Sequence, residues 1–72
     1  MNQDVLKGKW MQLKGEVRTQ WGKLTNDDLD QIQGNSEKLV GKLQERYGYA
    51  KEQAQTEYDH FVRRYSDDVV TP

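Results

Sequence analysis

An all-α fold is the prediction that this sequence supports best, and three observations lead to it. Apolar residues recur at intervals of three and four from Leu6 onward, which places them on one face of a helix. Glycines and helix-capping residues follow these periodic segments where helices would end and begin. No segment shows the alternation typical of a β-strand. The sequence therefore predicts a small bundle of about four helices, and two helical hairpins with such narrow apolar faces bury most when they cross.

The first predicted helix starts at Asn2 or Asp4 and runs to about Trp21. Its apolar positions are Leu6, Trp10, Leu13, Val17, Trp21 and Leu24. At 3.6 residues per turn these side chains lie on one narrow face. Three glycines fall on the opposite side: Gly8, Gly15 and Gly22. A glycine inside a helix costs about 0.5–1 kcal/mol relative to alanine, so this helix depends on tertiary packing, and we expect Gly22 to act as its C-terminal cap.

A second, short helix is predicted from about Asn26 to Gln33. Thr25 and Asp28 have the spacing of a capping box, in which each side chain accepts a hydrogen bond from the other residue's backbone N–H. Three acids near its start are favoured by the helix dipole: Asp27, Asp28 and Asp30. They could also suggest a calcium site, but the oxygen spacing and distal glutamate of an EF-hand loop are absent. We therefore expect helix-start roles for these acids and no resident metal.

Two longer helices are predicted after Gly34. Asn35-Ser36 caps a helix over about Glu37 to Tyr47, and Gly48 ends it. The last helix runs from about Ala50 to Tyr65, and its start is poorly capped because alanine offers no side-chain acceptor. The predicted inward positions of the last three helices are Leu29, Ile32, Leu39, Leu43, Tyr47, Ala54, Tyr58, Phe61 and Tyr65, with Val40 beside them.

Length and composition predict one small domain over residues 1–65, followed by a flexible tail at 66–72. Only 33% of the 72 residues are hydrophobic and 32% are charged, so the two tryptophans, four tyrosines and one phenylalanine must supply much of the buried area. The absence of cysteine excludes disulfides, thiol catalysis and cysteine-ligated zinc. It also fits a reducing cytoplasm. No apolar run is long enough to span a membrane, and no signal peptide is expected.

Several short segments carry a resemblance to a known family: Trp10, Lys14-Gly15, the run from Trp21 to Asp28, Ile32-Gln33-Gly34, Leu39-Val40-Gly41 and the run from Gln44 to Tyr49. Together they resemble the CsbD-like family of small bacterial stress proteins over most of the chain. The resemblance implies two crossed helical hairpins, similar in shape to SAM-domain-like folds, and expression in general or osmotic stress. It implies no catalytic or ligand-binding residue, since none is established for the family.

Candidate functional residues are few. His60 is the only histidine, and because no nucleophile or metal-ligand spacing accompanies it, we expect it at the surface. Lys7, Lys14 and Arg18 form a basic row beside the apolar face of the first helix. Such a row could contact nucleic acid, but three cations neutralise few phosphates and an acidic helix follows, so a solvated face is the expected role. A membrane-surface role for the first helix is also disfavoured, because its apolar face is needed inside the domain.

The sequence thus predicts a non-enzymatic, cytoplasmic stress-response protein that is monomeric and has no cofactor and no small-molecule substrate. The alternative is a helical interaction module that binds a protein or nucleic-acid partner through a groove between hairpins. Of these two partners nucleic acid is the less expected, because the net charge is −1 and no segment is strongly basic. An enzyme is the third and least favoured class.

Overall fold

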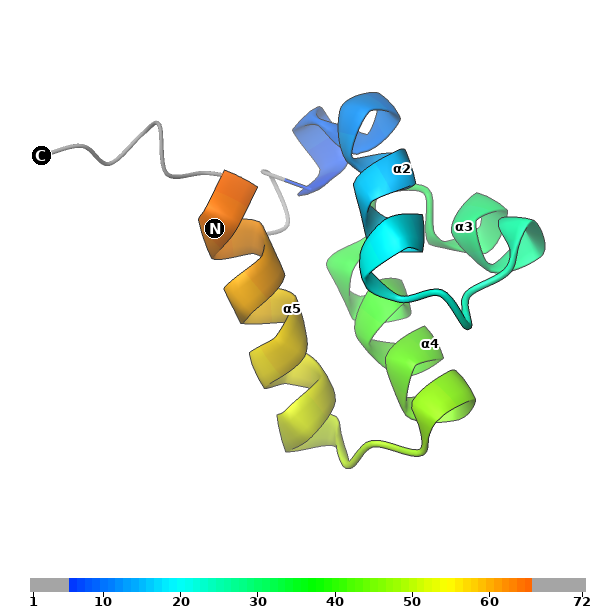
Figure 1. Cartoon of the computed structure of the whole chain (residues 1–72), viewed down its shortest axis with the longest axis vertical. Coiled ribbons are helices and arrows are strands. Elements are labelled where there is room, and N and C mark those ends of the chain that lie inside the picture. The colour runs from blue at the N-terminus through cyan, green and yellow to red at the C-terminus, as the bar shows by residue number, and fades with distance from the viewer. Residues whose placement is uncertain (1–5, 66–72) are drawn as a thin grey trace, which may run out of the picture.

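The computed structural model describes residues 6–65, and its helices confirm the predicted all-α class. Figure 1 shows the labelled helices α2 (Trp10–Gln20), α3 (Asn26–Ile32), α4 (Ser36–Tyr47) and α5 (Lys51–Tyr65). Residues 6–8 are also helical and precede a turn at Lys9, and no residue in the described range belongs to a strand. The predicted start of the first helix at Asn2 or Asp4, and the predicted tail from Ser66, lie outside the described residues.

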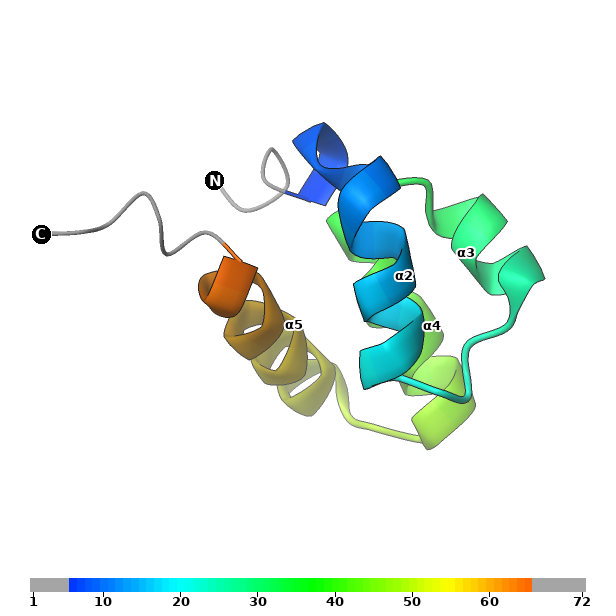
Figure 2. The same ribbon diagram turned by 45° about the horizontal axis from the view of Figure 1, so that its top comes forward.

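The four labelled helices form two successive pairs, α2–α3 and α4–α5, that pack against each other. In both ribbon views α4 lies centrally, with α5 along one side and α3 along the other (Figures 1 and 2). The second view shows α2 in front of α4 (Figure 2). Polar contacts join α2 and its N-cap residue to the end of α5: the Lys9 ammonium donates to the Tyr65 carbonyl at 3.1 Å, and the Tyr65 hydroxyl donates to Glu16 on α2 at 3.0 Å.

The predicted apolar positions form most of the core, which also contains Val62, a residue that the periodicity did not predict. The buried cluster comprises Leu6, Leu13, Val17, Trp21, Leu24, Leu29, Ile32, Leu39, Val40, Leu43, Ala54, Tyr58, Phe61 and Val62. Trp10, Tyr47 and Tyr65 were expected to face inward, but they are only partly buried at the edge of this cluster. The two hairpins meet where the rings of Trp21 and Phe61 lie 5.0 Å apart, centroid to centroid. The bundle is therefore closed by side chains from both pairs, because neither pair could bury its narrow apolar face alone.

The first predicted helix is not continuous, which corrects the sequence-based expectation. The chain leaves helical geometry at Lys9 (φ −115°, ψ 20°), whose carbonyl accepts from the N–H groups of Gln12 and Leu13 and starts α2. The turn before this bend packs against the α3–α4 loop. A Cβ at Gly34 would lie only 3.0 Å from Cα of Lys7. The bend therefore lies beside a tertiary contact, which the regular apolar spacing from Leu6 to Trp10 does not reveal.

Gly22 does not cap the first helix as predicted. The helix ends at Gln20, and Trp21 is the C-cap residue (φ −124°, ψ 84°), with its N–H donating to the Val17 carbonyl. Trp21 is only 2% exposed, and the chain departs from the helix at the residue whose ring is held in the core. Gly22 therefore lies in the turn beyond the cap.

The other predicted caps are confirmed. Thr25 and Asp28 form the capping box at the start of α3, and the Asn35 side chain accepts from the Lys38 N–H at the start of α4. Gly48 ends α4 in the left-handed region, at φ +72°. The short helix α3 ends one residue earlier than expected, because Gln33 itself adopts a left-handed conformation before Gly34.

Candidate functional site

The predicted basic row of Lys7, Lys14 and Arg18 is divided in the structure. All three side chains are exposed, but Lys7 precedes the bend at Lys9 whereas the other two lie on α2. The Lys14 ammonium is 3.9 Å from an Asp30 carboxylate oxygen, and the Arg18 guanidinium donates to the Asn26 side-chain oxygen. Two of the three cations are therefore directed toward α3, and Lys7 belongs to a different surface.

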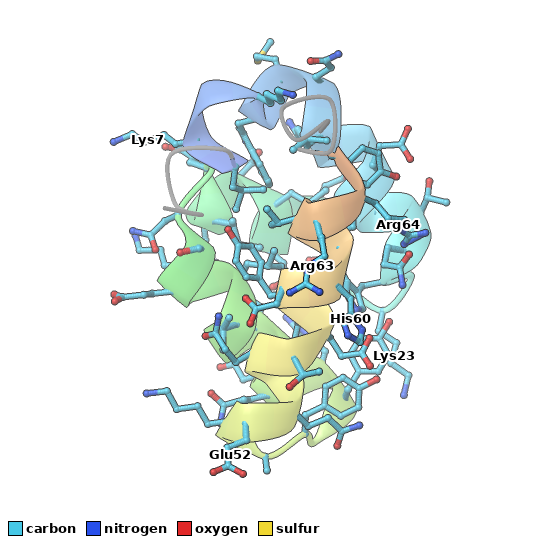
Figure 3. The ribbon with its side chains drawn as sticks, turned by 90° about the vertical axis from the view of Figure 1, so that its left-hand side faces the viewer. Lys7, Lys23, Glu52, His60, Arg63 and Arg64 are labelled. Carbon is cyan, nitrogen blue, oxygen red and sulfur yellow. The ribbon has the colours of Figure 1, made fainter. Side chains whose placement is uncertain are left out.

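His60 is exposed on α5, as the sequence predicts. In Figure 3 it lies on the same helix as Arg63 and Arg64, while Lys7 extends from the opposite edge of the view. Arg64 donates to the Gln20 side-chain oxygen at 2.8 Å, so it joins α5 to α2. Within residues 6–65, no group of three or more His, Cys, Asp or Glu side chains is arranged to hold a metal ion.

The predicted acids near the start of α3 have three different surroundings. Asp27 is exposed, and Asp30 is an exposed partner of Lys14. Asp28 is only 1% exposed. The prediction that Asp28 acts as a helix-start residue is correct, but it describes only part of its role.

Asp28 is the buried centre of a partly exposed ion cluster between α3 and α4. Its carboxylate accepts two hydrogen bonds from the Arg46 guanidinium, both at 2.8 Å, and one from the Thr25 N–H at 3.0 Å. The Lys42 ammonium lies 3.4 Å away. The Arg46 hydrogen bonds hold the pKa of Asp28 well below its usual range, although burial acts in the opposite direction. Asp28 therefore remains a carboxylate that fastens the start of α3 to the end of α4.

A second buried polar pair lies between α4 and α5. Ser36 and Tyr58 are both buried, and their side chains share a hydrogen bond. Burial raises the pKa of Tyr58 to about 12, an effect that Ser36 partly offsets. The Tyr58 hydroxyl is therefore neutral at physiological pH and serves the packing of the two helices.

A shallow groove, which we call the α3–α4 groove, lies between the two hairpins. It consists of two adjoining hollows of about 420 and 350 Å³ that share Gln31 and Lys38. The first hollow extends along α4 to Gly41, Lys42 and Glu45. The second extends across the α3–α4 loop to Lys7. The structure thus brings Lys7 close to residues of α4 with which sequence reasoning did not associate it.

Sequence reasoning placed a possible groove between the hairpins but did not identify its residues, and it missed the ion cluster. Arg46 and Lys42 were not identified as partners of Asp28, and only the spacing of four between these two basic residues could have suggested that they share a face of α4. Nothing local indicates which acid they meet. Their pairing depends on how the helices pack.

Comparison with known proteins identifies the same family that the sequence resembles. The family model described as CsbD-like matches residues 4–56. The UPF0337 protein YjbJ of Escherichia coli O6:H1 is 54% identical over 65 residues, which cover 90% of this chain and 94% of the relative. The UPF0337 protein PA4738 of Pseudomonas aeruginosa is 57% identical over 67 residues, covering 93% and 97% of the two chains.

No solved structure gives a significant match to the chain. The likeness to SAM-domain-like folds therefore stays a prediction. Within residues 6–65, no helix has both the length and the apolar character needed to cross a bilayer.

Proposed function

We propose, from the premise that the chain belongs to the CsbD-like family, that it is a non-enzymatic protein of the general or osmotic stress response. The matched relatives confirm the family that the sequence resembles. We further propose that it acts in the cytoplasm as a monomeric helical domain. The family resemblance supports the stress role, and the cysteine-free composition supports the compartment.

The non-enzymatic part of the proposal rests on one observation: the buried side chains that could react are engaged in contacts between helices. Asp28, which is buried, has its carboxylate oxygens occupied by the capping box and by Arg46. Tyr58 is hydrogen-bonded to Ser36 inside the core. A catalytic group must be free to contact a substrate, and these groups instead hold helices together. We infer that the polar residues of the interior serve stability.

The second candidate function is an interaction module, and the α3–α4 groove favours it. The groove lies between the two hairpins, which is where the sequence-based alternative placed a binding surface. A partner captured there would contact residues of the α3–α4 loop and one face of α4. The two candidate functions therefore differ in whether the protein needs the surface of the groove in order to act.

Complementation under osmotic stress tests the proposal. A strain lacking the gene is shifted to high salt, and survival is compared after re-expression of the parent, His60→Ala or Trp21→Ala. We expect the parent and His60→Ala to protect equally, and Trp21→Ala to fail because the core is lost. Loss of protection by folded His60→Ala would argue for chemistry at the lone histidine and against the proposal.

A pull-down from salt-stressed cells, together with titration of total cellular nucleic acid, separates the two candidate functions. The stress-domain proposal predicts no stoichiometric macromolecular partner. A stoichiometric partner whose capture is lost in Lys38→Glu, but kept in the α5 variant Arg63→Glu, would support the interaction module instead.

A further inference from the structure

The α3–α4 groove carries an excess of positive charge. Its charged lining residues are Lys7, Lys38, Lys42 and Glu45. Glu45 is paired with Lys42 at 3.5 Å, and Asp28 below them is already paired with Arg46 and Lys42. Within residues 6–65, the ammonium groups of Lys7 and Lys38 have no carboxylate partner. The groove therefore has a net charge of about +2, and a concave surface focuses such a field.

A close backbone contact sets the position of Lys7 at this groove. Gly34 has φ +82°, and a Cβ there would lie 3.0 Å from Cα of Lys7 and 3.3 Å from Cβ of Trp10. Only glycine accommodates both the left-handed conformation and this approach. The contact places Lys7, from before the bend, on the same groove as Lys38, from the first turns of α4. These two cations are thus held on a fixed scaffold.

The acids of α3 do not neutralise these cations. Asp28 is buried in its ion cluster, and the Asp30 carboxylate is paired with Lys14 on α2. The residues that α3 and its end contribute to the groove are instead Gln31, Ile32 and Gln33. Side-chain amides can donate hydrogen bonds to the oxygens of an anion. By contrast, the hollow between α4 and α5 carries Glu37 as well as Lys51, and has no such excess.

We propose that the α3–α4 groove binds a small ligand that carries two or more phosphate groups. Lys7 and Lys38 would provide the positive charges, and Gln31, which lines both hollows, would donate a hydrogen bond. Lysine commonly binds phosphate as a point charge, and hollows of this volume fall in the range of small-molecule sites, about 300–1,000 Å³. The ligand is bound and not turned over. This inference stands apart from the proposed stress role, because it names a ligand class that no part of that role requires.

Two glycine variants test the site with inorganic tripolyphosphate as the probe. A Cβ added at Gly41, in the groove, or at Gly15, on α2, would meet no neighbouring atom within 4 Å, so both positions accept a larger residue. Gly41→Glu adds a carboxylate at a residue that lines the groove and also borders the α4–α5 hollow, and Gly15→Glu makes the same change elsewhere. In NMR titrations near physiological ionic strength, about 0.15 M, we expect Gly41→Glu to weaken binding at least about tenfold, which is about 1.4 kcal/mol. Gly15→Glu should bind as the parent does.

A second pair of variants removes the cations directly. Lys7→Gln/Lys38→Gln should also weaken tripolyphosphate binding at least about tenfold. By contrast, Lys51→Gln/Arg63→Gln removes two charges outside the groove and should leave tripolyphosphate binding unchanged. The backbone amide signals that move in the parent should belong to residues 31–41 and Lys7. The proposal would be overturned by any of three results: equal weakening of tripolyphosphate binding by both pairs of variants, amide signals that move outside this set of residues, or no saturable binding in the millimolar range.

Titration with a short single-stranded oligonucleotide tests whether the bound phosphate groups belong to a small ligand or to a nucleic acid. If the groove serves a small phosphorylated ligand, the oligonucleotide should bind no more tightly than tripolyphosphate, since the groove contacts few phosphates. Much tighter binding of the oligonucleotide, lost in Gly41→Glu and kept in Gly15→Glu, would replace the small ligand with a nucleic acid.

Discussion

At the scale of single residues, Asp28 illustrates how one carboxylate can stabilise two elements. It completes the cap of α3 through Thr25 and accepts a bidentate pair from Arg46 on α4. Bidentate hydrogen bonds between charged groups are stronger than hydrogen bonds between neutral groups. Because Asp28 is buried, loss of the Arg46 guanidinium would leave its carboxylate charge without adequate solvation.

Asp28→Asn should lower stability and change its pH dependence. The substitution removes the charged acceptor of the Arg46 hydrogen bonds, and since the Arg46 side chain left behind is 42% exposed and stays solvated, we expect a loss of about 1.5–3 kcal/mol, the range for hydrogen bonds to charged groups. The pKa of Asp28 is lowered in the folded state, so its contribution is present above the unfolded-state pKa of about 3.9. That contribution is lost as the pH falls from there toward the lower folded-state pKa.

Urea unfolding at neutral and acidic pH measures both effects. The parent should be more stable than Asp28→Asn at neutral pH, and the difference between them should shrink below about pH 4. A difference that is the same at both pH values would show that Asp28 does not act through its charge.

The two tryptophans should respond differently to truncation. Trp21 is 2% exposed and packs on Phe61, whereas Trp10 is only partly buried at the edge of the core. Trp21→Ala should therefore cost about 3–5 kcal/mol, which approaches the whole stability of a domain this small. Trp10→Ala should cost less. Circular dichroism melts measure both changes, and a cooperative melt of Trp21→Ala near the parent temperature would contradict the packing described above.

At the scale of the helices, caps and left-handed residues set where each element ends. The capping box of α3 has donor–acceptor distances of 3.0 and 3.1 Å. Thr25→Ala removes one of these bonds and should destabilise by about 1 kcal/mol. Asp30→Asn removes only an exposed pair and should cost much less. Chemical unfolding of both variants tests this order, and a larger loss at Asp30 would point to an ion site on α3.

Glycines in this fold should fall into two classes when they are replaced by alanine. Gly48 has φ +72° at the end of α4, so Gly48→Ala should destabilise by about 1–2 kcal/mol. Gly15 lies inside α2 with open space around it, so Gly15→Ala should stabilise by about 0.5–1 kcal/mol. Thermal melts should show opposite shifts in Tm. A stabilising Gly48→Ala would mean that α4 does not end at this residue.

At the scale of the whole molecule, the predicted basic row does not come together as one free positive face on the described residues. Of the predicted basic row, Lys14 is near Asp30 and Arg18 is bonded to Asn26. Even three phosphate contacts would give a log–log salt slope of only about −3 on duplex DNA. We therefore expect no detectable duplex binding at micromolar protein and about 150 mM salt.

Fluorescence anisotropy with labelled duplex DNA tests this expectation. The control is Lys7→Glu/Lys14→Glu/Arg18→Glu, which should stay folded because all three side chains are exposed. A sub-micromolar complex with the parent that this variant abolishes would favour the interaction module over the stress-domain proposal.

The sequence by itself determined the helices and most of the core. Periodicity identified the buried positions from Leu6 to Phe61, and the caps at Thr25, Asn35 and Gly48 were predicted because capping involves residues only a few positions apart. It did not reveal the bend at Lys9. Residues 6–8 and α2 have the same apolar spacing whether the helix is straight or broken.

Tertiary structure alone decided which distant residues meet. The departure from α2 at Trp21 follows from the packing of its ring on Phe61. The pairing of Arg46 with Asp28, and the meeting of Lys7 with Lys38 at one groove, depend on how the hairpins are placed. Local preferences act over a few residues, whereas these contacts are set by the packing of the whole bundle around one core. The candidate site belongs to this second class, since its residues come from three segments: the turn before α2, the end of α3 with its loop, and α4.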